Sequence, residues 1–167
     1  ICKVDRQKRC EMDEEKRIAI FLSEFDFQLE QIIEIYEKLN QKVPEFEKQV
    51  PSKPLIESAG YWLHNLYSAY EDLFKLVCGF WENNISTNGD YHINLLKRMI
   101  IDIDGIRPAM LSEACYRDLN ELRGFRHVFR HAYAYGLDDD RVSVLLRKTV
   151  RNKDAILHDV RVFRSKI

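Results

Sequence analysis

The chain has 167 residues, of which 46% are hydrophobic and 32% charged, and its formal net charge is −1. This composition excludes an intrinsically disordered protein, and no apolar run approaches the ~20 residues that a membrane-spanning helix needs. Because only 6 glycines and 4 prolines are present, the sequence favours one domain of a few long helices over an all-β fold rich in turns.

The first half of the chain reads as two long helices. Residues 1–11 lack the apolar core of a signal peptide, and we expect them to be an extension, disordered or derived from cloning, ahead of a natural start at Met12. Apolar residues then keep helical spacing from about residue 13 to residue 41. After three prolines, a second helix is expected from near Pro54 to about Trp81.

The middle of the chain is more polar and holds only a short helix. Residues 83–90 and 102–111 carry turn signals and are expected to form loops. Between them, apolar positions over about 91–101 predict one short helix.

Capping residues mark the last two long helices. Ser112 is suited to cap a helix that runs to Tyr135, and Gly136 is suited to end it in the left-handed conformation. Asp138 is suited to cap the final helix, whose apolar positions extend to Val160. Together the elements predict an all-α domain over residues 12–167, a bundle of four long helices plus one short helix.

The four cysteines give no sign of a metal site or of a disulfide framework. They form no C-x-x-C pair, and no histidine follows at zinc-ligand spacing. Cys78 and Cys115 lie within apolar patterns and are expected in the core. A reducing, cytoplasmic location is therefore the default expectation.

The charges are unevenly distributed along the chain. Residues 1–96 carry 11 basic and 17 acidic side chains, whereas residues 97–167 carry 15 and 10, and 11 of those 15 cations are arginine. An arginine-rich region can bind phosphate groups even when the whole chain is almost neutral. The alternative is an ordinary solvated helical surface.

The segment 119–135, LNELRGFRHVFRHAYAY, concentrates cations on one side of a helix. At about 100° per residue, six polar side chains share an arc of roughly 160° with no acid among them: Arg123, Arg126, His127, Arg130, His131 and Tyr133. The opposite arc is apolar and would anchor the helix: Leu122, Phe125, Val128, Phe129 and Ala132. Clustered cations lower histidine pKa values and attract a polyanion such as phosphate. The competing interpretation is an arginine-rich face paired with acids from other helices.

Arg126-x4-His131-x-Tyr133 resembles the R-x4-H-x-Y signature of HepT-like toxins, a branch of the HEPN superfamily of helical ribonucleases. Residues 106–114 (IRPAMLSEA) and 122–138 (LRGFRHVFRHAYAYGLD) look like the cyanobacterial and related prokaryotic branch. The resemblance covers nearly all of residues 12–167.

The resemblance implies a toxin–antitoxin function and a metal-independent endoribonuclease without a cofactor. Two protomers would pair so that their motif helices face each other and bind RNA in a shared cleft. His131 would act as general acid or base for attack of a ribose 2′-OH on the adjacent phosphate, Arg126 would stabilise the phosphoryl charge, and Arg123 and Arg130 would bind RNA phosphates. Tyr133 would be adenylylated by a partner nucleotidyltransferase antitoxin.

One position departs from the family pattern and leaves a role open. Many relatives carry Asn directly after the motif arginine, where this chain has His127. His127 is therefore either an orienting residue or a second proton carrier, and the division of acid and base roles between His127 and His131 is not fixed.

Two other function classes remain open on the sequence alone. One is a non-catalytic HEPN module that binds a nucleotide or docks a nucleotidyltransferase. The other is a helical adaptor whose basic face binds an acidic protein. An intact set of Arg126, His131 and Tyr133 favours the enzyme, because a docking module would not require these residues.

Overall fold

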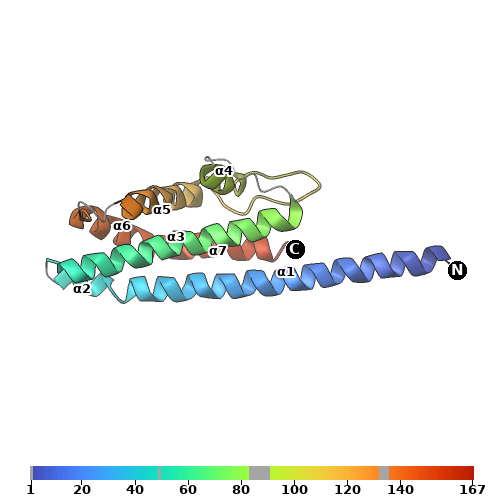
Figure 1. The fold of residues 1–167 in the computed structure, drawn as a ribbon, viewed down its shortest axis with the longest axis horizontal. Helices are drawn as coiled ribbons and strands as arrows, with labels where there is room; N and C mark the ends of the chain where they lie inside the picture. Colours follow the sequence, from blue (N-terminus) through green and yellow to red (C-terminus); the bar gives the residue numbers. More distant parts are fainter. Residues whose placement is uncertain (1, 49, 83–90, 132–135) are drawn as a thin grey trace.

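The computed structural model describes residues 2–48, 50–82, 91–131 and 136–167, and these residues form seven helices and no strand (Figure 1). The helices are α1 (Cys2–Asn40), α2 (Val43–Lys48), α3 (Lys53–Trp81), α4 (Tyr91–Arg98), α5 (Glu113–His131), α6 (Asp139–Arg151) and α7 (Lys153–Arg164). The predicted all-α class is confirmed. None of the described helices combines the length and the apolar character needed to cross a membrane.

Helix α3 is the central element of the bundle. It contacts α1, α4, α5 and α6, and it runs side by side with α1 along most of its length (Figure 1). Because neighbours surround α3, buried residues occur around most of its circumference. Aromatic side chains fill the α1–α3 seam, where the Tyr36 and Tyr70 hydroxyls lie 3.1 Å apart in a buried hydrogen bond.

Helix α1 begins earlier than the sequence pattern indicates. It starts at Cys2 rather than near residue 13, and its first turns extend beyond the rest of the bundle (Figure 1). The segment before residue 18 is rich in Lys, Arg, Gln and Glu, which are good helix formers without any apolar stripe. Apolar periodicity therefore misses this part of the helix.

Two further helix boundaries differ from the prediction of four long helices and one short helix. Within the proline-rich connection, α2 (Val43–Lys48) places Phe46 in the core. The last predicted helix is divided into α6 and α7 at Asn152, whose φ and ψ are −91° and 2°. The Asn152 side-chain amide donates to Asp118 on α5 at 2.8 Å, a contact that favours the change of direction.

The predicted caps of α5 and α6 are confirmed. The backbone N–H of Cys115 donates to Ser112 Oγ at 3.3 Å, and the N–H of Arg141 donates to Asp138 Oδ1 at 3.1 Å. Gly136 has a φ of 78°, which a residue with a side chain adopts only with strain. The predicted end of α5 at Tyr135 lies outside the described residues, as does the loop at 83–90.

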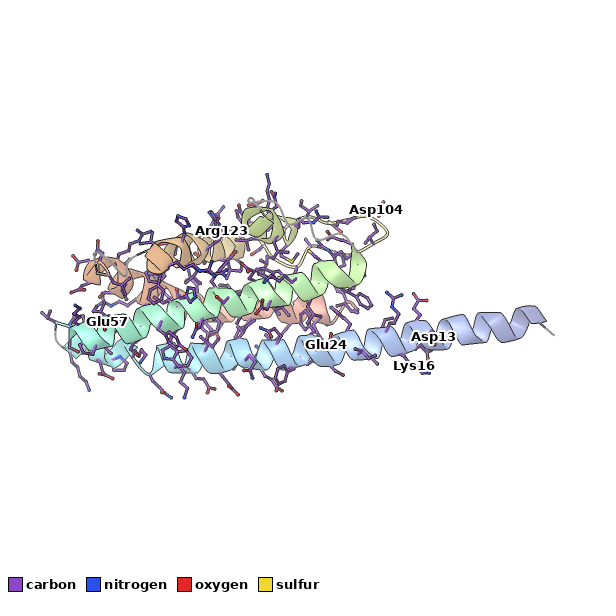
Figure 2. The ribbon with its side chains drawn as sticks, viewed as in Figure 1. Asp13, Lys16, Glu24, Glu57, Asp104 and Arg123 are labelled. Carbon is purple, nitrogen blue, oxygen red and sulfur yellow. The ribbon has the colours of Figure 1, made fainter. Side chains whose placement is uncertain are left out.

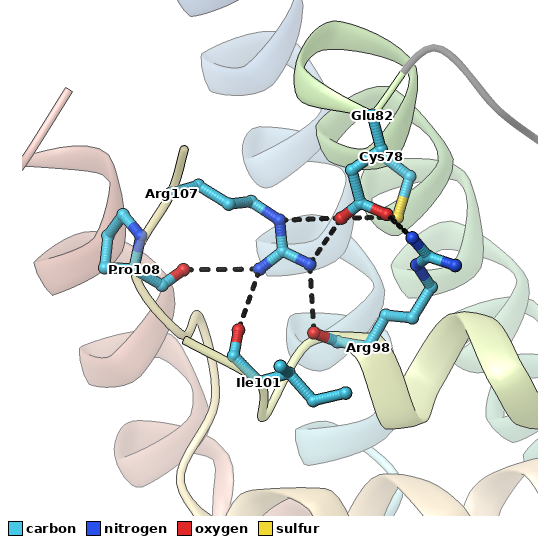
Figure 3. A network of polar contacts seen from close by, with 6 residues as sticks. All are labelled: Cys78, Glu82, Arg98, Ile101, Arg107 and Pro108. Atoms are coloured by element: carbon cyan, nitrogen blue, oxygen red, sulfur yellow. Dashed lines mark hydrogen bonds and ion pairs between the residues drawn. The ribbon is translucent and has the colours of Figure 1, made fainter. Parts of the chain in front are cut away.

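A buried arginine fastens the segment between α4 and α5 to the end of α3 (Figure 3). Arg107 is 0% exposed at its side chain, and its Nε and Nη2 donate to Glu82 Oε1 at 2.9 and 2.6 Å. The rest of the guanidinium donates to the carbonyl oxygens of Arg98, Ile101 and Pro108. The guanidinium thus ties the end of α4 and the irregular segment that follows it to the end of α3.

Cys78 and Cys115 are buried free thiols, as predicted. Burial raises the pKa of each to about 11, with Glu82 adding to the effect at Cys78 and Asp159 at Cys115. Thiols held in the protonated form are poor nucleophiles, so neither cysteine is a candidate catalytic residue.

Candidate functional site

Helix α5 packs antiparallel to α3 through the apolar side of its sequence. Leu119, Leu122 and Phe125 are buried, and Phe129 is half-buried against the core. Val128 was expected on the same arc, but it is 39% exposed. Val128 is exposed because the buried side of α5 is the side that packs against α3, and Val128 lies outside that side of the helix.

Arg126 lies at the near edge of this contact and reaches an acid on α3. Its Nη1 donates to Glu71 Oε2 at 2.5 Å, and the side chains of Arg126 and Glu71 are 11% and 3% exposed. Lys75, one turn along α3, places its Nζ 3.0 Å from the other Glu71 oxygen. The guanidinium carbon also lies 5.7 Å from the centre of the Tyr67 ring, within the range of a cation–π contact.

This burial overturns one expectation from the sequence. The sequence analysis placed Arg126 on an arc of the helix with no acid among its members, available to bind a polyanion. Instead, an alanine at Arg126 would leave Glu71 without its arginine in a buried position, which is strongly destabilising. The alternative of pairing with acids from other helices is thus correct for Arg126.

The other predicted phosphate-binding arginines lie farther round α5. Arg123 is half-buried on the side of the bundle away from α1 (Figure 2), and its Nε donates to Asn120 within the same helix at 3.0 Å. Arg130 is exposed and forms no ion pair within the described part of the chain. His127 is also exposed. The structure therefore brings Arg126, Arg123, Arg130 and His127 onto one helix, with only Arg126 drawn into the α3 contact.

Two residues of the predicted motif cannot be placed. The backbone of His131 closes α5, but its side chain, like the whole of Tyr133, lies outside the described residues. The roles of both residues therefore stay predictions.

His64 on α3 joins the site, although no role was expected for it from the sequence. Its ring stacks on Phe129 of α5 with centroids 5.2 Å apart and planes at 26°. Its Nδ1 is buried and has no hydrogen-bond partner. Burial lowers the pKa of His64 from its usual 6.5, and the nearby charges of Arg126 and Arg130 lower it further. The imidazole is therefore neutral at pH 7.

We expect the stability of the protein to fall as the pH drops below 6.5. A histidine whose folded pKa is lower than its unfolded pKa binds fewer protons in the folded state, so the free energy of unfolding decreases as pH falls through 6.5 and levels off below the folded pKa. Urea unfolding between pH 5 and 8 measures this slope, and His64→Leu should flatten it. A His64 ring signal that titrates at the same pH in folded and urea-unfolded protein would contradict the prediction.

Three α3 residues to which the sequence analysis assigned no role lie on the side of α3 that faces α5. They are His64, Tyr67 and Glu71. Their spacing of three and four residues puts them on one side of the helix. The signal was present in the spacing, since Glu71 follows Tyr67 by four residues and precedes Phe74 by three, which places it on the same side of α3 as these buried rings.

The described residues contain no group of three or more His, Cys, Asp or Glu side chains that could hold a metal ion. The polar groups around Arg126 are instead cations, one acid and neutral rings. Such a set can bind an anionic oxygen and hold its charge in place.

Comparison with known families gives a match over the C-terminal two thirds of the chain. A family model described as HepT-like protein matches residues 58–167, a segment that begins inside α3 and includes both Glu71 and the whole of α5. Comparisons with curated proteins and with solved structures give no significant match.

Proposed function

The chain belongs to the HepT-like protein family, and from this membership we propose that it is a metal-independent endoribonuclease, the toxin of a HEPN/nucleotidyltransferase toxin–antitoxin pair. The observation that carries the proposal is the cationic side of α5, where Arg126, Arg123 and Arg130 follow one another at helical spacing. Of these three, only Arg126 is paired with an acid within the described residues. The uncompensated charge supports a polyanionic ligand.

RNA supplies its own nucleophile for this reaction. A ribose 2′-OH loses its proton, its oxygen forms a bond to the adjacent phosphorus, and the bond from phosphorus to the 5′-oxygen breaks. The leaving oxygen takes up a proton, and the products are a 2′,3′-cyclic phosphate and a 5′-hydroxyl. We propose that His131 moves one of these protons, with His127 as orienting group or second proton carrier, and that Arg126 stabilises the charge on the phosphoryl oxygens.

We further propose that two copies of the chain pair through the α5 side. One helix end offers a small basic patch, whereas two facing copies of Arg126 and His131 would form a cleft long enough for an RNA strand. Light scattering of the purified protein at micromolar concentration measures the assembly. An active, monodisperse monomer would contradict the pairing.

The test of the proposed function is RNA cleavage by the purified protein, with and without EDTA. We expect equal rates in both, cyclic phosphate at the product ends, and no cleavage of DNA, which lacks the 2′-OH. Loss of activity on removal of metal would reject the mechanism. Binding of RNA or nucleotide without any cleavage would favour the alternative of a non-catalytic HEPN module.

Arg130→Ala is expected to weaken RNA binding and its salt dependence more than it slows the chemistry. Arg130 is an exposed cation, and losing one phosphate contact to a single strand lowers the slope of log K against log salt by about 0.7. Titrations at several salt concentrations measure this slope. Arg141→Ala, which removes an exposed arginine on α6, is the matched control, and an equal effect in both variants would count against a specific role for Arg130.

Tyr133→Phe is expected to retain nuclease activity and to escape inactivation by the antitoxin. The phenol oxygen is the acceptor that adenylylation would need, and phenylalanine lacks it. Addition of AMP at Tyr133 would bring bulk and negative charge near the arginines and repel RNA. Mass spectrometry after incubation with the cognate nucleotidyltransferase and ATP measures the transfer, and an AMP adduct on the variant at the wild-type level would refute this assignment.

A further inference from the structure

We propose that Tyr61 on α3 is a stacking platform for an RNA base: its exposed ring contacts the base while Arg130 of α5 binds a phosphate of the same strand. The inference rests on the proposed function, since it concerns the way in which the same side of the molecule holds RNA. It assigns a binding role to an α3 residue outside the R-x4-H-x-Y motif.

The first step is the position of Tyr61 relative to α5. An added Cβ at Gly60, the residue before Tyr61, would come within 3.1 Å of the Phe129 ring. The ring of His64, almost one turn after Tyr61, stacks on the same Phe129 with centroids 5.2 Å apart. The turn of α3 that carries Tyr61 is therefore level with Phe129, which precedes Arg130 in the chain.

The second step is that Tyr61 and Arg130 belong to one accessible side of the bundle. Residues three apart on a helix are neighbours on its surface, so Tyr61 lies beside His64. The charges of Arg126 and Arg130 reach His64 and lower its pKa. Arg130 is exposed and Tyr61 is 52% exposed, so both side chains are open to the same ligand.

The third step is the distribution of charge along this side. Glu57, one turn before Tyr61 on α3, is an exposed acid and disfavours a phosphate at that end. Arg126 meets α3 at Glu71, in the opposite direction from Tyr61. The charges thus favour a strand that runs from Tyr61 past Arg130 towards Arg126.

The fourth step is that the ring is held before RNA binds. Tyr61 packs edge-to-face against Trp62, with centroids 5.3 Å apart and planes at 75°, and Trp62 is itself half-buried against the core. A ring fixed by such a contact has little freedom to lose when a base stacks on it. Proteins bind single-stranded RNA through such rings together with cations that contact the backbone, and the stacking tolerates any base.

The experiment measures the affinity of the purified protein for a short, labelled, single-stranded 2′-O-methyl oligonucleotide. This probe lacks the attacking 2′-OH, so it is bound without being cleaved. Tyr61→Leu is expected to weaken binding roughly 5- to 100-fold, the range of one base–aromatic stack. Tyr61→Phe keeps the ring and should bind as the wild type does. Because no charge is lost, Tyr61→Leu should keep the wild-type slope of log K against log salt.

Two controls separate stacking from other effects. Phe27→Leu removes the other exposed aromatic ring among the side chains that the structure describes, which is 63% exposed on α1. Since α3 lies between α1 and α5 (Figure 1), this variant should keep the wild-type affinity. An abasic oligonucleotide, which has the sugar–phosphate chain alone, should bind equally to the wild type and to Tyr61→Leu.

Several outcomes would overturn the proposal. They are no binding of the probe by the wild type, wild-type affinity in Tyr61→Leu, an equal loss in Tyr61→Phe or Phe27→Leu, and a loss that persists on the abasic chain. A change of assembly in Tyr61→Leu, measured by light scattering, would place Tyr61 in a protein interface and would also overturn it.

The proposed function can fail separately from the stacking role. A wild type that binds the probe through Tyr61 but cleaves no RNA would reject the ribonuclease activity alone. A wild type that cleaves RNA, with no effect of Tyr61→Leu on binding, would reject the stacking role alone.

Discussion

Replacing His131 with alanine is expected to lower the rate of RNA cleavage by ~10²–10⁴-fold, the usual contribution of a general acid or base. His131 ends α5, one turn after His127 and at motif spacing from Arg126. The variant should keep its helical circular dichroism and its RNA affinity, because the arginines that attract the phosphates remain. Single-turnover cleavage of a labelled RNA separates the chemical step from binding.

His158→Ala is the matched control, since His158 is an exposed histidine on another helix, α7. It should cleave at the wild-type rate. Cleavage by His131→Ala at the wild-type rate would remove His131 from the mechanism. If His127→Ala alone abolishes the reaction, the proton-transfer role moves to His127, which the sequence left open.

The corresponding change at Arg126 calls for a different substitution. Alanine at Arg126 would also leave the buried Glu71 without its arginine. A loss of activity could then come from the loss of a catalytic group or from unfolding of the protein. Arg126→Lys keeps the positive charge but loses the planar fork, which makes it the cleaner test of phosphate recognition.

Arg107→Met is expected to destabilise the protein by ~3–5 kcal/mol, because it leaves a buried carboxylate without its main partner. Glu82 is 6% exposed, and Arg107 gives it two hydrogen bonds while also satisfying three carbonyl oxygens (Figure 3). Urea unfolding at neutral pH measures the change in free energy. Because Arg107 holds the segment between α4 and α5 to the end of α3, we expect the whole bundle to unfold at a lower urea concentration, rather than one segment alone.

Arg98→Met is the control for this prediction. Arg98 also pairs with Glu82, but its side chain is 46% exposed. An ion pair with so exposed a partner contributes only ~1 kcal/mol or less. Equal losses in the two variants would contradict the view that Arg107 is the structural partner of Glu82. The double variant Arg107→Met with Glu82→Gln should recover part of the lost stability, because the uncompensated charge is then absent.

The features that the sequence predicted correctly depend on neighbours in the chain. Ser112 and Asp138 cap helices by accepting hydrogen bonds from N–H groups three residues away. The left-handed conformation of Gly136 depends only on its own φ. Apolar spacing located α3 and α5 because it reports which side of a helix is buried. Local chemistry was sufficient for these elements and for the all-α class.

The features that the sequence missed depend on residues far away in the chain. The division between α6 and α7 occurs at Asn152, which bonds to Asp118, 34 residues earlier. The burial of Arg126 depends on Glu71, 55 residues earlier. Helical periodicity placed Arg126 at the edge of the apolar arc. It does not predict which helix packs against that edge or which side chain of that helix pairs with Arg126.

The contacts between α3 and α5 also determine the register of the two helices. Two pairs match along the antiparallel contact: Arg126 with Glu71, and Phe129 with His64. Beyond the end of α5, Leu137 lies so close to Gly60 that an added Cβ would come within 2.8 Å of the leucine. A slip of one turn, about 5.4 Å, would set Leu122 or Arg130 opposite Glu71. Leu122 would leave the acid unpaired, and Arg130 would draw an exposed cation into the core. The buried ion pair thus selects one alignment of α5 against apolar packing that would tolerate several, and it fixes the position of the motif along α3.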